Sequence, residues 1–251
     1  MPTPIAPFIS AVRSSVLGGG GAATPYSDIL VDYGAFEVWI PSSMVDATIP
    51  AKITPDRDGS ATGWDIQNSP GVITNTLVPY IDGANDVSTL LSASLISNFN
   101  GHIGSVFIWG KDNNPGDTSL RYLWRSAVNT SNEVTLAKLG GEHVFVYISG
   151  GVAKFDGVSP SSDFFSMGMS WKDGDNGDEV RCFYNGSYVF SFTGLGVWSG
   201  VLGASRIGVV GTSPGNVWNG WVDYPAIRFD SVWSDDDFSA IHAAAASAGA
   251  G

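Results

Sequence analysis

The stretch from Ser205 to Ala246 constrains the fold more than any other part of the chain. It begins with a β-branched run at 206–210 and passes through a loop that contains Pro214. A long run at 218–232 follows, in which the side chains alternate with a period of two. This period is typical of a strand in a sheet, and Pro225 within the run predicts an edge or a bulge. The stretch therefore predicts two strands joined by a turn.

A capped helix is expected directly after the second strand. Ser234 precedes three aspartates at 235–237, and Phe238, Ile241 and a run of alanines follow. A serine hydroxyl can accept from the exposed amides of a first helical turn, and carboxylates in that turn suit its partial positive charge. We expect the helix to start at Ser234.

Short apolar segments with turn residues between them fill the preceding part of the chain. Such a series predicts an all-β sandwich or jelly roll rather than a parallel α/β sheet. The chain has a single cysteine, so its stability must come from the core, to which nine Trp and thirteen Phe contribute. The expected strands are 35–40, 64–66, 72–78, 88–96, 105–109, 119–126, 133–139, 143–149, 152–155 and 164–171.

Three motifs follow one another in a characteristic order. They are an Asp-Gly-x-x-Asp stretch at 82–86, an aromatic-Tyr-Asn-Gly hairpin at 183–186, and the strand and capped helix at 218–246. In this order they resemble the laminin-G-like domains of the concanavalin A-like lectin and glucanase superfamily. The resemblance implies a jelly-roll sandwich of two antiparallel sheets with a short C-terminal helix. It fits a single domain at 25–251.

The first 24 residues differ from that domain. Four consecutive glycines at 18–21 form a flexible joint, and the segment before them is more apolar than a free tail needs. A disordered tail is the commoner state of such termini, and docking on a neighbouring subunit is the alternative that we favour. The residues expected to make this attachment are Phe8, Ile9, Val12, Val16 and Leu17.

The charge balance excludes some partners. Lys and Arg total 12 against 24 Asp and Glu, which gives a net charge of −12 without any basic cluster. Such a chain repels a phosphate backbone, so we expect no nucleic-acid binding. No segment reaches the roughly 20 apolar residues that span a bilayer, so we expect no membrane insertion.

Catalytic carboxylates are not evident in the sequence. A glycoside hydrolase needs two carboxyl groups on one face, whereas the glutamates Glu37, Glu133, Glu142 and Glu179 form no such repeat. The histidines at 102, 143 and 242 have no metal-ligand spacing, and Cys182 is expected to be a buried small hydrophobe. We therefore expect no enzymatic activity.

Calcium is the one cofactor that the sequence brings into question. The acidic run 172–179 could supply oxygen ligands, but it does not match a helix-loop-helix site, and we favour a hairpin loop of turn formers. The resemblance instead implies an ion at the sandwich rim, where Asp82 and Asp86 would be its ligands.

Aromatic residues near loops are candidates for stacking on sugar rings. Packing in the core explains them equally well. The candidates are Trp64, Trp198, Trp218 and Tyr224.

These observations lead to one expected function and two alternatives. The start of the chain has no secretory signal, although the fold that it resembles acts mostly outside cells. A virion protein of a tailed bacteriophage, made in the host cytoplasm, satisfies both facts. We expect a non-enzymatic head decoration, tail or fibre protein that displays a lectin-like jelly roll, with other virion proteins, further copies of itself in a homo-oligomer and cell-surface glycans as partners. A free extracellular lectin and a glycoside hydrolase of the same fold are the alternatives.

Overall fold

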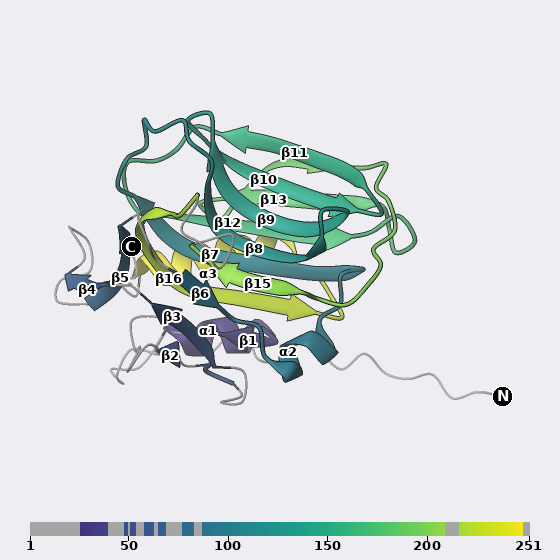
Figure 1. Cartoon of the computed structure of the whole chain (residues 1–251), viewed down its shortest axis with the longest axis horizontal. Coiled ribbons are helices and arrows are strands. Elements are labelled where there is room, and N and C mark those ends of the chain that lie inside the picture. Colours follow the sequence, from purple (N-terminus) through teal and green to yellow (C-terminus); the bar gives the residue numbers. More distant parts are fainter. Residues whose placement is uncertain are drawn as a thin grey trace.

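Two antiparallel sheets stacked face to face form the body of the protein in a computed structural model (Figure 1). A smaller sheet of three short strands lies beside them. This architecture confirms the predicted all-β jelly-roll sandwich. The structure describes residues 26–39, 48–49, 51–53, 58–62, 65–68, 77–82, 87–208 and 216–247.

The larger sheet has eight strands in the order β14-β13-β12-β7-β16-β5-β4, and β1 pairs with β16. Its strands are β1 (Glu37–Val38), β4 (Asp65–Asn68), β5 (Leu77–Asp82), β7 (Ile103–Asp112), β12 (Phe165–Lys172), β13 (Glu179–Tyr184), β14 (Ser187–Phe192) and β16 (Asn219–Phe229).

The second sheet has five strands in the order β11-β10-β9-β8-β15. Its strands are β8 (Arg121–Asn129), β9 (Asn132–Leu139), β10 (Glu142–Ser149), β11 (Val152–Val158) and β15 (Ala204–Ile207). The three-stranded sheet contains β2 (Thr48–Ile49), β3 (Gly59–Thr62) and β6 (Val87–Thr89), and the helices are α1 (Tyr26–Asp32), α2 (Ala93–Asn98) and α3 (Asp235–Ser247).

Two-residue turns fix the register of β9, β10 and β11. The turns are Gly140-Gly141 and Gly150-Gly151, and all four residues have positive φ angles between 54° and 86°. Tight hairpin turns need this conformation at both central positions, and glycine adopts it without steric cost. The pairing from β9 through β11 then runs without a register shift.

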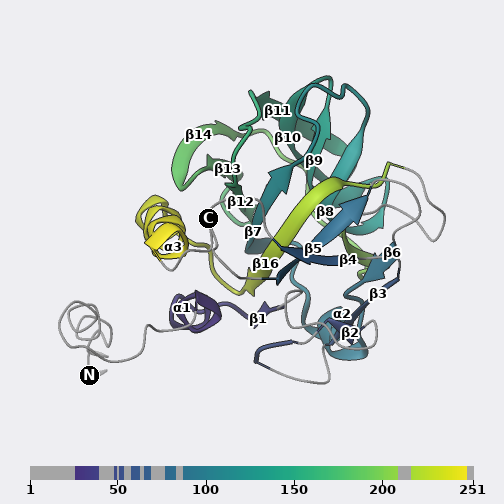
Figure 2. The same ribbon diagram turned by 90° about the vertical axis from the view of Figure 1, so that its left-hand side faces the viewer.

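The larger sheet is buried on both of its faces. On β7, Val106 and Ile108 point into the core between the two sheets, while Phe107 and Trp109 point to the other face. That other face packs against α1 and α3, as Figure 2 shows. The order of layers is therefore helices, large sheet, five-stranded sheet.

β16 carries the predicted irregularity. Its register against β7 shifts between Asp223 and Ala226, and Tyr224 within the shift has a φ of 45°. Pro225 cannot donate to a ladder, so a bulge accommodates it in the interior of the sheet. The prediction of an edge or bulge at Pro225 is confirmed.

Cys182 on β13 is buried, as predicted. Val180 and Cys182 belong to the core between the sheets, while Phe183 faces the helices. Burial raises the pKa of the Cys182 thiol well above its ordinary value.

The predicted cap of α3 is confirmed. Ser234 Oγ accepts from the Asp237 N–H at 3.2 Å, and the Asp237 carboxylate accepts from the Ser234 N–H at 2.9 Å. This reciprocal pair satisfies donors that the helix itself leaves unpaired.

Ser234→Ala is expected to lower the free energy of unfolding by roughly 0.5–2 kcal/mol, because it removes the acceptor for the Asp237 N–H. Chemical denaturation of the variant and the wild type measures the difference. Ser191→Ala on exposed β14 is the matched control, and a loss no larger than that of the control would contradict the role of the cap.

Two helices were not expected from the sequence. α1 at 26–32 was not predicted, and the expected strand 88–96 is wrong in its second half. There the chain leaves β6 after Thr89 and forms α2, because Ser92 Oγ caps the Leu95 N–H at 3.0 Å. No helix within the described ranges combines the length and apolar character that a membrane crossing requires.

Candidate functional site

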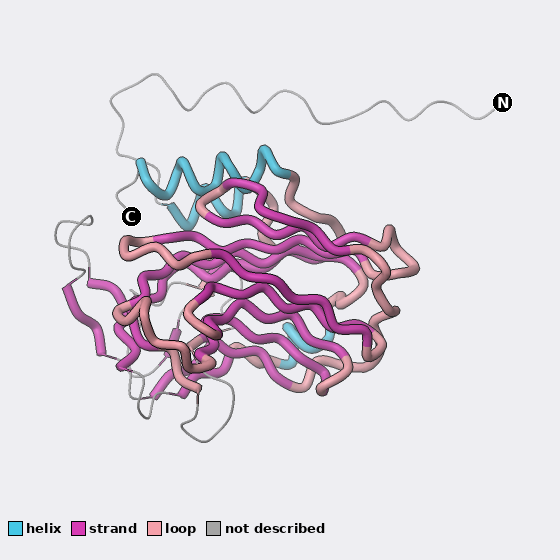
Figure 3. The backbone as a smooth tube through the Cα atoms, turned by 90° about the horizontal axis from the view of Figure 1, so that it is seen from above, coloured by secondary structure: helices cyan, strands magenta, loops and turns pink. Residues whose placement is uncertain are grey.

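The five-stranded sheet turns one face to the core and the other away from it. Neither α1 nor α3 lies over this second face, because both helices cover the opposite side of the molecule (Figures 2 and 3). We call this surface the outer face. Its principal residues are Tyr122, Arg125, Glu133, Thr135, Val146, Phe155 and Arg206.

Strand register places five of these residues in one row. Each residue of the row is the direct cross-strand partner of the next. Directly opposite residues on one sheet face have Cβ atoms about 4.5–5.5 Å apart, so the row forms a continuous surface. From β15 to β11 the row is Arg206, Arg125, Thr135, Val146 and Phe155.

A charged cluster occupies the β15 half of the outer face. Arg125 Nη2 donates to Glu133 Oε2 at 2.7 Å, and Thr135 Oγ1 donates to Glu133 Oε1 at 2.6 Å. The Arg125 side chain is 19% exposed, and its Nε is buried without a hydrogen-bond partner among the described residues. Glu133 and Thr135 are themselves only 8% and 1% exposed, so the cluster is fixed in place and Arg125 is its most exposed member.

Two more polar groups adjoin this cluster. Arg206 Nη1 donates to the Ser88 carbonyl at 3.0 Å, and burial followed by the charge of Arg125 lowers the pKa of Arg206. Burial followed by the charge of Glu133 raises the pKa of Tyr122. The outer face thus brings two guanidinium groups, a carboxylate and a phenol together.

The β11 half of the outer face is apolar. Val146 is partly exposed, and Phe155 is 69% exposed at the edge of the sheet. Sugars present hydroxyl groups beside apolar ring faces, and they suit a surface that combines fixed polar groups with an aromatic ring. The outer face has both elements side by side.

The predicted glycan-binding aromatics do not gather on this surface. Trp198 and Trp218 are only 3% and 1% exposed, and both pack in the core between the sheets. Tyr224 lies at the β16 bulge and packs on the helix side of the large sheet. For Trp198 and Trp218 the prediction of sugar stacking is wrong, because an indole inside the core presents no face to a ligand.

Several other predicted residues lie outside the described part of the chain. They include Trp64, Asp86 and the attachment residues Phe8, Ile9, Val12, Val16 and Leu17. Asp82 ends β5 with its backbone opposite Asn219, and its side chain is not described. Within the described ranges, no three His, Cys, Asp or Glu side chains are arranged to hold a metal ion.

The acidic run 172–179 forms the expected hairpin loop. Asp173 is fully buried and accepts from the Trp198 N–H at 2.8 Å, while Asp178 accepts from the Gly194 and Leu195 N–H groups. Asp173 also lies 2.6 Å from Nδ1 of the half-exposed His102. These carboxylates therefore hold the neighbouring loop at 194–198.

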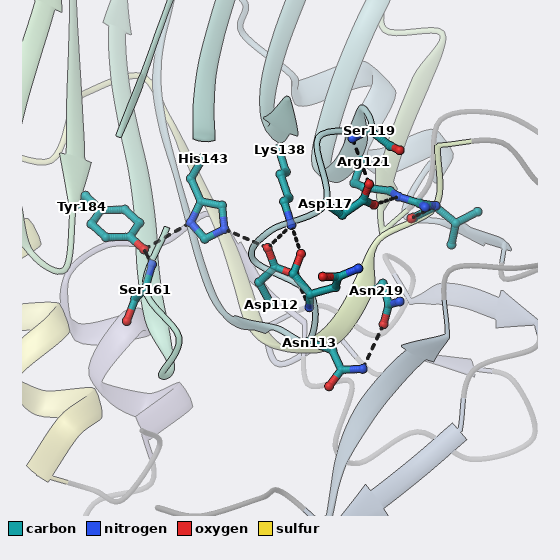
Figure 4. Close-up of polar contacts among 12 residues, drawn as sticks. Asp112, Asn113, Asp117, Ser119, Arg121, Lys138, His143, Ser161, Tyr184 and Asn219 are labelled. Carbon is teal, nitrogen blue, oxygen red and sulfur yellow. Dashed lines mark hydrogen bonds and ion pairs between the residues drawn. The ribbon is translucent and has the colours of Figure 1, made fainter. Parts of the chain in front are cut away.

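A buried polar network lies between the sheets at the C-terminal end of β7 (Figure 4). Lys138 Nζ is 2.7 Å from Asp112 Oδ2, and His143 Nε2 is 3.5 Å from the same oxygen. His143 Nδ1 lies 3.1 Å from the Tyr184 hydroxyl, which accepts from the Ser161 N–H. The network connects β7 and β13 of one sheet with β9 and β10 of the other.

The pKa shifts and the burial of this network indicate a structural role. Burial lowers the pKa of His143 against the effect of Asp112. Burial alone would raise the pKa of Asp112, but its contacts with His143 and Lys138 outweigh burial and lower it. Because Asp112, Lys138 and His143 are at most 4% exposed, a substrate cannot reach them.

The outer-face residues that matter were not identified from the sequence. In β8 and β9 they alternate with core residues such as Trp124, Val134 and Leu136. A period of two with Arg125, Glu133 and Thr135 on the polar side was the available signal. Their proximity depends on strand register, which the pattern alone does not specify.

No protein-family model and no curated protein sequence matches the chain. Solved structures do match its fold. Domain 4 of AbnA, an extracellular GH43 arabinanase from Geobacillus stearothermophilus solved with arabinotriose, aligns with a TM-score of 0.60 and 16% identity over 83% of this chain and 98% of that domain.

Binding domains of botulinum neurotoxins also share the fold. The receptor-binding domain of mosaic serotype C/D aligns with a TM-score of 0.62 and 11% identity, over 85% of this chain and 51% of that domain. The serotype G binding domain aligns with a TM-score of 0.57 and 11% identity over 83% of this chain. The chain spans about half the length of these neurotoxin domains. At such identities the likeness shows the β-sandwich fold.

Proposed function

We propose that this chain is a non-enzymatic, lectin-like module that binds a glycan on its outer face. The observation that carries the proposal is the Arg125–Glu133–Thr135 cluster, in which the buried Glu133 and Thr135 hold the partly exposed Arg125 beside an apolar strip on the face that α1 and α3 leave uncovered. Fixed donors and acceptors recognise sugar hydroxyls in defined directions. The presence of the same fold in a domain solved with arabinotriose and in toxin binding domains supports this proposal.

The positions of the acidic residues also support a role without enzymatic activity. The buried Asp112, Lys138 and His143 are inaccessible, and Asp173 is engaged in holding a loop. Glu133, the acidic residue of the outer face, is paired with Arg125 at 2.7 Å. This arrangement suits binding without bond cleavage, because a general acid needs access to the scissile bond.

Arg125→Lys is expected to weaken binding of the strongest glycan on an array by at least about tenfold. Lysine keeps the charge but loses the planar guanidinium group, whose direction the bond to Glu133 fixes. The full chain is first screened on the array, with calcium and with a chelator, and the dissociation constant of the best ligand is then measured by calorimetry.

Arg181→Lys is the matched control for this experiment. Arg181 pairs with Asp235 at 2.5 Å near the start of α3, on the helix side of the large sheet. If Arg125→Lys binds as tightly as Arg181→Lys, the glycan site is elsewhere. If the wild type binds no glycan at all, the lectin proposal is wrong. Loss of binding in the chelator alone would support a calcium ion, for which Asp82 and Asp86 remain the proposed ligands.

We also propose that the module is displayed on a virion, as a head decoration or a tail or fibre component. The supports are the acidic, cysteine-poor composition and the apolar segment before the joint at 18–21. Burying three or four such side chains on a neighbour contributes on the order of 1.5–3 kcal/mol each before the cost of ordering them.

Deletion of residues 1–20 is expected to abolish incorporation into virus particles and to leave the thermal unfolding midpoint nearly unchanged. Particle incorporation is measured by complementation and immunoblotting of purified particles. A variant with Gly18–Gly21 replaced by serines is the control, since it keeps the apolar residues. Wild-type incorporation of the truncated chain would mean that attachment does not depend on residues 1–20.

A further inference from the structure

β11 is an open edge of the five-stranded sheet. It pairs with β10 through seven consecutive residues without a register shift, and it is last in the strand order among the described residues. Natural proteins usually protect such an edge with a bulge, a proline or a very short strand. β11 has none of these three devices, and its charged residues Lys154 and Asp156, which could also protect an edge, are opposite in sign and can pair with those of another strand. Phe155 at its centre is 69% exposed.

Two other described edges are protected. β14, at the edge of the large sheet, has a register shift opposite Cys182 and Phe183. β15, at the other edge of the five-stranded sheet, has four residues, and the Leu90 N–H next to β6 donates to the Ser205 carbonyl. β11 therefore differs from these edges in being long, regular and open.

The sequence of β11 is complementary to itself when it is reversed about Phe155. In an antiparallel pair centred on Phe155, Lys154 of one strand lies opposite Asp156 of the other. Ala153 then lies opposite Gly157, and Val152 opposite Val158. Opposite charges at directly facing positions stabilise a strand pair, and each such contact occurs twice in a two-fold symmetric dimer.

From this self-complementarity we infer that β11 pairs in antiparallel fashion with β11 of a second copy of this chain, centred on Phe155. The two five-stranded sheets join into one continuous sheet across the dimer axis. The two Phe155 rings meet on the outer face, and two Lys154–Asp156 pairs form on the opposite face of the strands.

The local contacts are compatible with this arrangement. Asp156 is exposed, and its Oδ1 accepts from the Gly157 N–H at 2.8 Å. Lys154 is partly exposed, and its charge contributes to lowering the pKa of Asp178, after the Leu195 and Gly194 N–H groups. Register places them opposite the core residues Tyr147 and Phe145, so both lie on the inward face of β11, which is open to solvent at this edge of the sandwich. The inference does not rest on the proposed function, because it uses only the edge and its sequence.

Charge reversal with rescue tests the pairing. The full chain is studied by sedimentation equilibrium over a range of concentrations. We expect a reversible dimer of the 26.3 kDa chain. Asp156→Lys places lysines opposite lysines twice, and Lys154→Asp places aspartates opposite aspartates twice. Each single variant is expected to raise the dimer dissociation constant at least about tenfold.

The double variant Lys154→Asp/Asp156→Lys restores opposite charges at both positions and is expected to dimerise within about threefold of the wild type. Asp175→Lys, at an exposed position in the loop between β12 and β13, is the matched control for a change of net charge. Thermal unfolding of each variant tests whether the monomer is folded. If Lys154→Asp is unstable because the new aspartate lies near Asp178, the result for Asp156→Lys decides.

Three results would overturn the inference. The first is a wild-type chain that remains monomeric at every concentration. The second is a dimer that Asp156→Lys weakens no more than Asp175→Lys does. The third is a double variant that stays as weak as the single variants, because only the register centred on Phe155 predicts the rescue.

Discussion

Asp112→Ala is expected to lower the free energy of unfolding by about 3–5 kcal/mol. The substitution leaves the ammonium of Lys138, whose side chain is 2% exposed, without its carboxylate partner at 2.7 Å. An unpaired buried charge costs far more than the pair itself contributes. The substitution also removes Asp112 Oδ1, which accepts from the Asn114 N–H at 2.9 Å in the loop after β7. Urea denaturation at neutral pH measures the loss.

Two further variants test whether the loss in Asp112→Ala comes from the unpaired buried charge: one breaks a surface ion pair, and the other removes both buried charges. Asp235→Ala breaks the exposed pair with Arg181 and is expected to cost at most about 1 kcal/mol. Asp112→Leu combined with Lys138→Met removes both charges, so it is expected to recover most of the stability that Asp112→Ala loses. If Asp112→Ala is as mild as Asp235→Ala, the interior pair is hydrated and does not tie the sheets together.

Phe238→Ala is expected to cost about 3–5 kcal/mol, because this ring anchors α3 to the large sheet. Phe238 stacks on Phe183 with ring centroids 4.0 Å apart and an interplanar angle of 19°. It fits there because Gly168 lacks a side chain, since a Cβ at Gly168 would lie 2.3 Å from the ring. Removal of the ring leaves a cavity under the helix.

Hydrogen exchange locates the effect of Phe238→Ala. Amides of α3 are expected to lose protection before those of β12 and β13, because the helix detaches from strands that keep their ladder. Phe238→Leu refills part of the cavity and is expected to cost about half as much or less. Equal loss of protection across helix and strands would show that α3 does not open as a separate unit.

Many of the strands and the final helix could be predicted from the sequence, whereas β2 and β3 were not among the expected strands. An alternation of residues indicates β16 on either side of its bulge, and a serine cap indicates α3. Both are local signals that depend on neighbouring residues alone. The segment 88–96 was assigned wrongly because its leucines suit either a strand or a helix. Ser92 caps a helix that begins at Ala93, because its Oγ accepts from the Leu95 N–H.

The candidate site could be predicted only in part. Aromatic residues near loops were candidates for sugar stacking, with core packing as an equal alternative, and Trp198 and Trp218 turn inward to fill the space between the sheets. Arg125 and Arg206 are neighbours because β15 returns beside β8 after a long excursion of the chain. That long-range pairing has no signature in either strand, so the position of Arg206 beside the cluster could not be predicted. The cluster itself depends on the register of the β8–β9 hairpin, which the alternation of residues does not specify.

The position of α1 and α3 has a consequence for how a tethered copy would be oriented. Tyr26 and Ser247, the two ends of the described part, both belong to the helices that pack behind the large sheet. A support attached to either end would therefore lie on the side covered by α1 and α3, and the sheet of β8 to β11 would face away from that support. If many such modules were carried on a curved surface, each would present Arg125 and Phe155 on the side facing away from that surface, without any change of conformation.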